Sequence, residues 1–564
     1  MKREEIVMKK LNASTESGFK KSRNVKNVQK SAIILLMVLL LGLASVQFSY
    51  ATMESDYKVY VMAPLEKITD WTAFKNQLIT LKNNGVYALT TDVWWGDVES
   101  AGDNQFDWSY YKTYADTVRA SGLKWVPIIS THQCGGNVGD TVNIYLPAWL
   151  WSKGTADQMQ FKDESGFMDK ETLSPWWSDT LTQYDELYAS FASNFSSYKD
   201  IIVKIYLSGG PAGELRFPSY NSAAGWSYPG RGKLQCYTDT AKADFRAAMT
   251  SKYGTISALN SAWGTNLASF AYVSPPADGD NFFINGYKTQ YGKDFLTWYQ
   301  GVLTKHLSNI AAKAHGRFDS VFGVRIGAKV AGVHWLMNSP TMPHAAEYCA
   351  GYYDYSTLLD QFKTSNIDLT FTCLEMDDAN AYASPYYSAP KSLVINVANL
   401  ARNKGIKHNG ENALAISNDN QKYQNVAEML FNYNFSGFTL LRLDNIVTSN
   451  GSPTSEMSPF KDAIAMKPVP VTFTVNNANT SYGQNVYVTG SRWELGKWDT
   501  AYYPAKLSYI NGQWQGTFYI GEGRYYEFKA IKKDGSGNVI WEGGANKAYT
   551  VPTGGGSYTW TWTN

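Results

Sequence analysis

Short apolar runs and amphipathic stretches alternate along the chain from Tyr57 to Arg442. Apolar runs bounded by polar residues and glycines are typical of buried β-strands. The stretches between them, among them 71–83, 182–195, 291–315 and 423–434, repeat their apolar residues at helical spacing. Eight strand-like runs occur, at residues 57–63, 88–93, 125–130, 203–207, 324–333, 367–374, 405–411 and 437–442.

Eight strand–helix units in this order predict a single architecture. Parallel strands joined by helices close into a (β/α)8 TIM barrel, an α/β fold whose active site lies at the C-terminal ends of its strands. We expect this barrel over residues 52–455, which exceeds the ~250 residues typical of such barrels. Long βα-loop insertions are therefore expected, and the stretches after Asn143, Phe217 and Ala258 are the candidates.

The pattern changes near the C-terminus. After Asp444 the chain contains the polar stretch TSNGSPTSEMSP, and we expect a linker at residues 456–466. From Val469 onward, runs such as VTFTVNN and NVYVTG alternate apolar and polar residues. This period of two, with glycine-rich turns between the runs, predicts an all-β sandwich over residues 467–564.

The most apolar segment lies near the N-terminus. Residues 32–46 read AIILLMVLLLGLASV, a region rich in Lys and Arg precedes them, and Ser49, Tyr50 and Ala51 follow. The run is shorter than the ~20 residues that span a bilayer. We interpret residues 1–51 as a signal peptide cleaved after Ala51, which predicts a secreted, extracellular protein with no membrane association after cleavage. An uncleaved N-terminal anchor is the alternative.

The amino-acid composition excludes several classes of protein. Aromatic residues make up 15% of the 564 residues and charged residues 18%, which excludes an intrinsically disordered chain and a coiled coil. Because 51 Lys and Arg balance 49 Asp and Glu, the chain lacks the basic field that nucleic acids require. The 4 cysteines form no CxxC pair and the 6 histidines form no HExxH motif, so neither redox chemistry nor a catalytic zinc ion is indicated.

Two glutamates at the ends of predicted strands are candidates for catalysis. Glu214 follows the fourth apolar run and Glu411 ends the seventh. A barrel gathers its strand ends at one mouth, and two carboxyl groups in an aromatic cleft are what hydrolysis of a glycosidic bond requires. For either glutamate alone, a structural hydrogen-bonding role is an equally good interpretation. Other polar residues complete the ring of strand ends: Asp92, Asp97, His132, Asp140, Lys329 and His334.

Six motifs carry a family resemblance: TTDVWWGDVE, ISTHQCGGNVGD, LSGGPAGELRFPSY, IGAKVAGVHW, FTCLEM and GENAL. With these motifs in this order, the chain resembles the bacterial β-amylases of glycoside hydrolase family 14 that carry a starch-binding domain of carbohydrate-binding module family 20. The resemblance implies an exo-acting 4-α-glucan maltohydrolase that inverts configuration. Such an enzyme releases β-maltose from the non-reducing ends of starch, amylose, amylopectin and maltooligosaccharides.

The same resemblance assigns roles to residues. It implies that Glu214 is the general acid and Glu411 the general base, with the carboxyl groups ~6.5 to 9.5 Å apart. The acid must be protonated and the base ionised, so we expect apolar or anionic surroundings at Glu214 and donors such as Asn412 at Glu411. Asp140 lies in a glycine-rich segment, 134–140, that predicts a mobile lid. The residues implied to hold the sugar are Asp92, His132, Asp140, Lys329, His334, Thr372, Asn412, Ala413 and Arg442.

The resemblance also implies a calcium ion away from the active site. Glu99, Asp103, Asn104 and Glu186 match the ligand pattern, whereas Gln183 stands where the pattern has a carboxylate. Calcium affinity falls with the charge of its ligands, so weaker binding than in the family pattern is expected. A solvated acidic loop is the alternative.

In the small domain, the resemblance implies a sugar-binding surface. Trp498, in ELGKWD, and Trp541 match two tryptophans that stack on adjacent glucose rings, and stacking suits the apolar CH faces of sugars. Lys529, Glu542 and Asn546 match the polar partners of that site. Tyr482, Tyr509 and Trp514 resemble a second site. A place in the sandwich core is the alternative for each aromatic residue.

Two other classes of function stay open at this point. One is a retaining, endo-acting glycosidase on the same barrel, in which Glu411 is the nucleophile and the carboxyl groups lie ~5 to 5.5 Å apart. The other is a secreted starch-binding protein whose barrel serves only as a scaffold. The size and anomeric form of the released sugar discriminate among the three. We expect a monomer.

Overall fold

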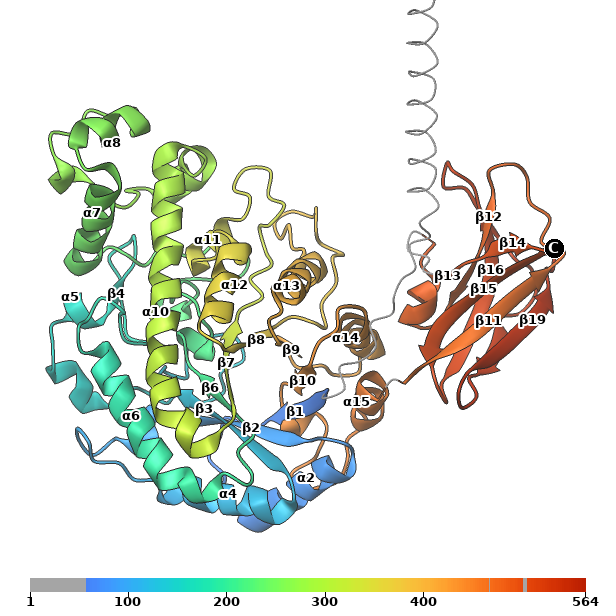
Figure 1. Cartoon of the computed structure of the whole chain (residues 1–564), viewed down its shortest axis with the longest axis horizontal. Coiled ribbons are helices and arrows are strands. Elements are labelled where there is room, and N and C mark those ends of the chain that lie inside the picture. The colour runs from blue at the N-terminus through green and yellow to red at the C-terminus, as the bar shows by residue number, and fades with distance from the viewer. Residues whose placement is uncertain (1–56, 466, 501–504) are drawn as a thin grey trace, which may run out of the picture. The chain divides into compact units, whose positions relative to one another are not determined.

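The computed structural model describes residues 57–465, 467–500 and 505–564. Its larger part is a closed barrel of parallel strands in the order β1-β10-β9-β8-β7-β6-β3-β2 (Figure 1). All eight predicted runs are confirmed as barrel strands. Their bounds are β1 Lys58–Met62, β2 Ala88–Trp94, β3 Lys124–Ser130, β6 Lys204–Leu207, β7 Arg325–Val330, β8 Asp368–Phe371, β9 His408–Glu411 and β10 Gly437–Leu440.

Helices pack around the outside of the barrel (Figure 1). Local sequence sets their ends: the Asp70 side chain accepts hydrogen bonds from two backbone N–H groups at the start of α2, and Gly323 ends α10 in the left-handed conformation at φ 63°. The main helices are α2 Trp71–Asn83, α4 Ser109–Ser121, α6 Thr180–Phe195, α10 Gln290–Phe322, α12 Tyr355–Thr364, α13 Pro390–Lys404 and α14 Asn420–Asn432.

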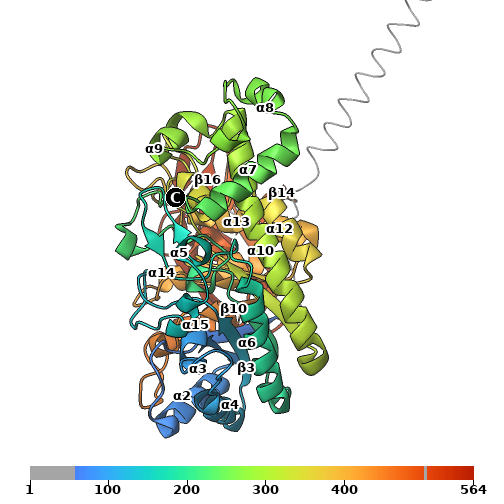
Figure 2. The same cartoon turned by 90° about the vertical axis from the view of Figure 1, so that its left-hand side faces the viewer.

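Long insertions follow β3 and β6, as the sequence predicts. The second of them carries α7 Asp239–Tyr253 and α8 Ile256–Trp263, which Figure 2 shows beside α10. The remaining short elements of the barrel are α3 Trp95–Val98, η1 Ala148–Ser152, α5 Ala156–Met159, β4 Phe161–Lys162, β5 Met168–Asp169, η2 Ser196–Tyr198, η3 Pro211–Gly213, η4 Ser222–Ala224, η5 Phe270–Tyr272, α9 Gly279–Asn281, η6 Phe282–Gly286, α11 Ala345–Ala350 and η7 Leu443–Asn445.

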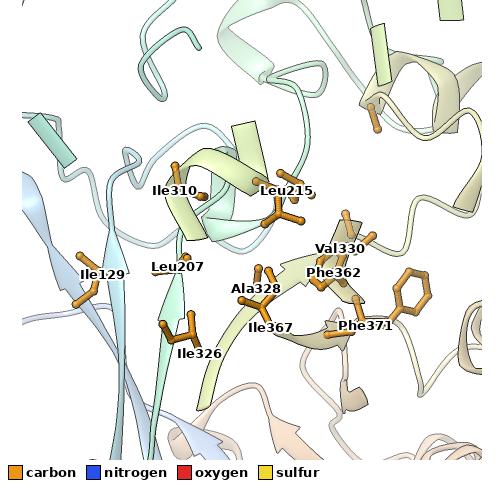
Figure 3. Close-up of a cluster of buried hydrophobic side chains, with 14 of the residues drawn as sticks. Ile129, Leu207, Leu215, Ile310, Ile326, Ala328, Val330, Phe362, Ile367 and Phe371 are labelled. Atoms are coloured by element: carbon orange, nitrogen blue, oxygen red, sulfur yellow. The ribbon is translucent and has the colours of Figure 1, made fainter. Parts of the chain in front are cut away.

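The core of the barrel lies between the strands and the helical ring. Figure 3 shows side chains of β6, β7 and β8, among them Leu207, Ala328 and Phe371, near Ile310 of α10 and Phe362 of α12. These side chains are almost fully buried. The four cysteines, Cys134, Cys236, Cys349 and Cys373, are buried as free thiols. No disulfide joins these four cysteines. The packing of buried side chains therefore holds the strand ends in place.

The C-terminal part is a separate all-β fold with its own core. One sheet has the strand order β14-β15-β11-β19, and the other has the order β13-β12-β16-β17 with β18 paired to β16. The bounds are β11 Pro468–Asn476, β12 Asn485–Gly490, η8 Trp493–Trp498, β13 Ala505–Lys506, β14 Ser508–Ile510, β15 Gln513–Gly521, β16 Tyr525–Lys533, β17 Val539–Trp541, β18 Lys547–Thr550 and β19 Gly556–Thr561. The two sheets confirm the predicted all-β domain.

One predicted boundary differs from the structure. Residues 456–466 were expected to form a linker, but they include helix α15, Met457–Ile464. Met457, Phe460 and Ile464 of this helix are buried in the core of the barrel part. The predicted signal peptide, residues 1–51, lies outside the described residues. Among the residues that are described, no helix is long and apolar enough to cross a membrane.

Candidate active site

Glu411 and Lys329 form a buried ion pair at the mouth of the barrel. Glu411 is the last residue of β9, and Lys329 lies on β7, two strands away in the barrel order. The Lys329 Nζ atom lies 2.9 Å from both carboxylate oxygens of Glu411. Burial raises the pKa of Glu411, the Lys329 ammonium lowers it, and the nearby Glu214 carboxyl raises it again. The two predicted catalytic glutamates are therefore close enough to affect each other's charge.

Glu214 follows the tight turn of η3, and a parallel bridge joins it to Lys329 of β7. Its carboxylate accepts a hydrogen bond of 2.8 Å from Nε of Arg216, and the two side chains form an ion pair. The expectation of apolar or anionic surroundings at Glu214 is therefore wrong. In this structure, the guanidinium group of Arg216 holds the Glu214 side chain in one orientation.

Arg216 also connects Glu214 to the predicted lid. Its Nη2 atom donates a 2.8 Å hydrogen bond to the side-chain oxygen of Asn137. The amide nitrogen of Asn137 in turn donates to Glu171, at 2.6 Å. Arg216 and Glu171 are both buried. Sequence reasoning did not single out either residue, although Arg216 lies within the motif that contains Glu214.

The sequence predicted that the Asn412 side chain donates a hydrogen bond to Glu411. In the structure, this side chain bonds to the backbone instead. Its side-chain amide donates to the backbone oxygens of Leu414 and Leu441, both at 2.9 Å, and its oxygen accepts from the Leu441 N–H group. It therefore fixes the backbone that follows β9. Glu375 has a similar role, because its buried carboxylate accepts hydrogen bonds from the backbone N–H groups of Ala413 and Leu414. Glu375 lies in the motif FTCLEM but was not predicted as a site residue.

Two histidines of the predicted site are buried and neutral. Burial lowers the pKa of His132 to about 4, and it lowers the pKa of His334 to about 4 as well. A serine hydroxyl lies against Nδ1 of each ring: Ser208 at 2.8 Å from His132 and Ser388 at 2.7 Å from His334. A neutral imidazole has one donor and one acceptor nitrogen, so each ring can present its Nε2 atom to a sugar hydroxyl.

Asp92 lies near the end of β2, and Asp140 lies on the loop that follows β3. Asp92, on β2, accepts a 2.9 Å hydrogen bond from the Ser130 hydroxyl. Asp140 closes its own loop, because its carboxylate accepts from the backbone N–H groups of Gly135 and Asn137 at 2.8 and 3.0 Å. Gly135 has φ 114°, a left-handed conformation that favours glycine. The loop is thus folded onto Asp140 in this structure.

The remaining predicted sugar-binding residues also lie at strand ends. Thr372 follows β8, and its hydroxyl accepts a 2.8 Å hydrogen bond from the backbone N–H group of Gly332. Arg442 follows β10 and donates to the backbone oxygen of Ala63, after β1, at 3.0 Å. Together with the residues above, they border one mouth of the barrel, as the fold class predicts.

The residues of the predicted calcium site make contacts with one another. Glu99 is buried and accepts hydrogen bonds from the Trp95 indole and the Asn104 backbone. Its pKa is raised to about 6, mainly by burial and further by the Asp103 and Glu186 carboxylates. Asp103 forms an ion pair with Lys153, and Gln183 donates to Glu186. In the described part of the chain, no three or more His, Cys, Asp and Glu side chains converge as a metal site requires.

On the sandwich, the two predicted sugar-stacking rings lie side by side. The Trp498 and Trp541 ring centroids are 6.3 Å apart with 40° between the planes, and Trp541 is 43% exposed. Lys529 donates to the backbone oxygens of Glu542 and Gly544. The Asn546 amide donates to Glu527.

Glu542 and the residues of the second predicted sugar site, Tyr482, Tyr509 and Trp514, differ in how exposed they are. The Glu542 side chain is buried, where it accepts hydrogen bonds from the Ala530 N–H group and the Trp560 indole. It therefore supports the surface from within. Tyr482 and Tyr509 are exposed, whereas Trp514 is buried and donates to the Ala478 backbone oxygen.

Comparison with known proteins agrees with this architecture. A family model described as glycosyl hydrolase family 14 matches residues 60–470. A second model, described as a starch binding domain, matches residues 468–561. The fold and these matches make the chain a glycoside hydrolase with a starch-binding domain. It belongs to glycosyl hydrolase family 14, and its relatives place it in the β-amylase class.

Three relatives illustrate the likeness. A thermophilic β-amylase of Thermoanaerobacterium thermosulfurigenes is 66% identical over 542 residues, which cover 95% of this chain and 98% of the relative. A β-amylase of Niallia circulans is 60% identical over 445 residues, which cover 78% and 77% of the two chains. The crystal structure of the catalytic domain of a Paenibacillus polymyxa β-amylase matches with a TM-score of 0.71 and 62% identity, covering 73% of this chain and 99% of that chain.

Proposed function

We propose that this enzyme hydrolyses α-1,4-glucosidic bonds in starch, amylose, amylopectin and maltooligosaccharides in an exo-acting, inverting reaction. It releases β-maltose from non-reducing ends. Glu214 donates a proton to the leaving oxygen as the glycosidic C–O bond breaks. Glu411 accepts a proton from the water whose oxygen bonds to the anomeric carbon from the opposite face.

The buried Glu411–Lys329 pair is the observation that carries this proposal. A general base must be ionised, and the ammonium group 2.9 Å from both of its oxygens stabilises the ionised form. Because Lys329 holds the carboxylate in one orientation, Glu411 can position the attacking water. The location at a strand end also places this water where a barrel binds its substrate.

The Arg216 guanidinium group holds the Glu214 carboxylate in this structure. Asn137, in the predicted lid, accepts a hydrogen bond from the same guanidinium group. A movement of the lid over bound glucan therefore alters the contacts of Arg216, and it removes bulk water at the same time. We infer that sugar binding, lid closure and the position of the Glu214 side chain are linked in this way.

The other site residues bind the glucan. Asp92, Asp140, Lys329 and Arg442 supply charged hydrogen-bonding groups, His132 and His334 supply neutral ones, and Thr372, Asn412 and Ala413 shape the strand ends. A retaining, endo-acting reaction with Glu411 as nucleophile is the main alternative. The test is the size and anomeric form of the first sugar released from soluble starch by residues 52–564.

On the sandwich, we propose that Trp498 and Trp541 stack on glucose rings of starch, with Lys529 and Asn546 beside them. We expect Trp541→Ala to weaken adsorption to starch granules about 2- to 12-fold, the effect of losing one aromatic stacking interaction. Ile540→Ala is the matched control, since Ile540 is the neighbouring exposed residue of β17 and points to the opposite face. Equal adsorption of the Trp541→Ala variant and the unchanged protein would contradict the assignment.

We propose that Glu99, Asp103, Asn104, Gln183 and Glu186 bind calcium weakly, because the three carboxylates must move closer together than they lie in this structure. Lys153 competes for Asp103, and Gln183 supplies a neutral oxygen. We expect calcium to raise the Tm, and to raise it more in Lys153→Gln, because removing the competing ammonium frees Asp103. The effect should fall as the pH drops below about 6, where Glu99 takes up a proton. A Tm that is the same in calcium and in chelator for both proteins would dispose of the site; magnesium is the control ion.

We also propose that residues 1–51 direct export and that the mature chain acts outside the cell as a monomer. The sequence of the N-terminal region carries this proposal. The mass and N-terminal sequence of the protein recovered from the medium test it. A product that retains residues 32–46 would indicate a membrane anchor instead.

A further inference from the structure

Exposed tyrosines lie beside the active site without a role in it. Tyr382 and Tyr386, on the loop between β8 and α13, are 84% and 38% exposed, and Tyr228, on the loop after η4, is 46% exposed. The Tyr386 and Tyr228 rings stack with centroids 5.8 Å apart and 24° between their planes. We call Tyr228, Tyr382 and Tyr386 the tyrosine platform.

The platform adjoins a residue that is expected to hold the glucan. The Tyr228 ring lies 6.5 Å from the His334 ring and 5.6 Å from the Trp335 ring. The loop that carries Tyr386 also contacts His334 directly, because the Ser388 hydroxyl is 2.7 Å from the His334 Nδ1 atom. The platform therefore continues the surface of the candidate active site outward from His334.

The loop of the platform is held in one conformation. The backbone oxygen of Tyr386 accepts a 2.9 Å hydrogen bond from the Leu336 N–H group, and the Asn338 amide donates to the Ala381 oxygen at 3.1 Å. At the other side of the loop, Asp378 accepts hydrogen bonds from the Ser392 backbone and hydroxyl. A fixed loop loses little conformational freedom on binding a ligand. The exposed rings are therefore presented in place rather than ordered by the ligand.

The chemistry of the platform suits a sugar chain. Aromatic faces bind the CH faces of pyranose rings, while the phenol hydroxyls can hydrogen-bond to sugar hydroxyls. The direction of the chain follows from the proposed function, on which this inference rests. When an exo-acting enzyme holds the non-reducing end at the strand ends, the rest of the glucan leaves the mouth on the side of the leaving group. A binding surface continuous with the mouth must therefore meet that part of the chain.

We propose that the tyrosine platform is an additional binding subsite for the leaving-side α-1,4-glucan chain, beyond the sugar units next to the cleaved bond. Short maltooligosaccharides end before they reach it, whereas amylose extends across it. The platform makes the enzyme favour long chains, and it does so through binding rather than through the chemical step.

The test compares short and long substrates in a Tyr382→Ala/Tyr386→Ala variant. The Trp541→Ala background is used throughout, so that the sandwich contributes less to amylose binding and contributes equally in every comparison. We expect KM for amylose to rise about 2- to 12-fold, with kcat for amylose and both constants for maltotetraose unchanged. Tyr386→Phe keeps the ring and should keep the KM of the background enzyme. Tyr272→Ala removes a ring on η5 that is 65% exposed, between the values for Tyr386 and Tyr382, and serves as the control.

Two results would overturn the subsite. Equal losses on maltotetraose and amylose would mean that the rings only support His334, and unchanged KM for both substrates would mean that the rings bind no glucan. Failure of the proposed function would give a different experimental result. In that case the background enzyme, with its tyrosines intact, would release no maltose from either substrate.

Discussion

Glu411→Gln is expected to lower kcat about 10²- to 10⁴-fold, the range that general acid–base groups contribute. Glutamine keeps the shape of the side chain but cannot take the proton from water. Glu214→Gln is expected to lose activity to a similar extent, because amide protons are not transferred to the leaving oxygen. Rates on soluble starch, with maltose affinity as a check of the fold, measure both effects. Glu66→Gln, at an exposed position, is the control.

Chemical rescue separates the two roles. Azide replaces the activated water, so it should restore turnover to Glu411→Gln and leave Glu214→Gln inactive. α-Maltosyl fluoride has a leaving group that needs no proton, so Glu214→Gln should hydrolyse it while Glu411→Gln should not. The opposite pattern of rescue would reverse the assignment of acid and base. Full activity of either variant on starch would remove that glutamate from the reaction.

Lys329→Met is expected to move the acidic limb of the pH–rate profile upward by about 1 to 3 pH units, the effect of an opposite charge on a nearby carboxyl group. Glu411 must be ionised to act as the base, so the rate falls as the pH drops through its pKa. The ammonium group lowers that pKa against the effect of burial. Removing it leaves burial and Glu214, which raise the pKa, against the smaller lowering effect of Arg442. The rate is then lost at higher pH.

The profile of kcat/KM against pH is the measurement, because it reports groups of the free enzyme. Lys329→Arg retains a positive charge and should leave the limb closer to its original position. Lys329→Met also leaves a buried carboxylate without its partner, which typically costs about 3 to 5 kcal/mol, so its Tm is measured beside its activity. An acidic limb at the same pH in Lys329→Met would contradict the ion pair's role in holding Glu411 ionised.

The sequence predicts the barrel well because of how parallel strands are buried. Helices cover the outside and neighbouring strands fill the inside, so such strands form apolar runs that are easily recognised. Helix α15 was missed for the opposite reason. Met457, Phe460 and Ile464 have helical spacing, but they follow a polar stretch rich in Ser, Gly and Pro, which suggested a linker.

The candidate site is predicted only in part. The rule that barrel sites lie at strand ends identifies Glu411 and Lys329, because it depends on topology alone. It does not identify which side chains meet. Arg216 contacts Glu214 next to a sharp turn of the chain, where Ala212 and Gly213 have φ of 55° and 74°. Asn412 turns toward the backbone of Leu441 rather than toward Glu411. Such contacts depend on side-chain direction, which spacing does not encode.

The anomeric proton signals of the first sugar released test the proposed exo-acting, inverting reaction. Residues 52–564 act on soluble starch while NMR spectra are recorded faster than the sugar mutarotates. We predict maltose alone, initially in the β form, with the α form growing in later. Oligosaccharides of mixed size that appear first in the α form would contradict it and would indicate a retaining, endo-acting enzyme.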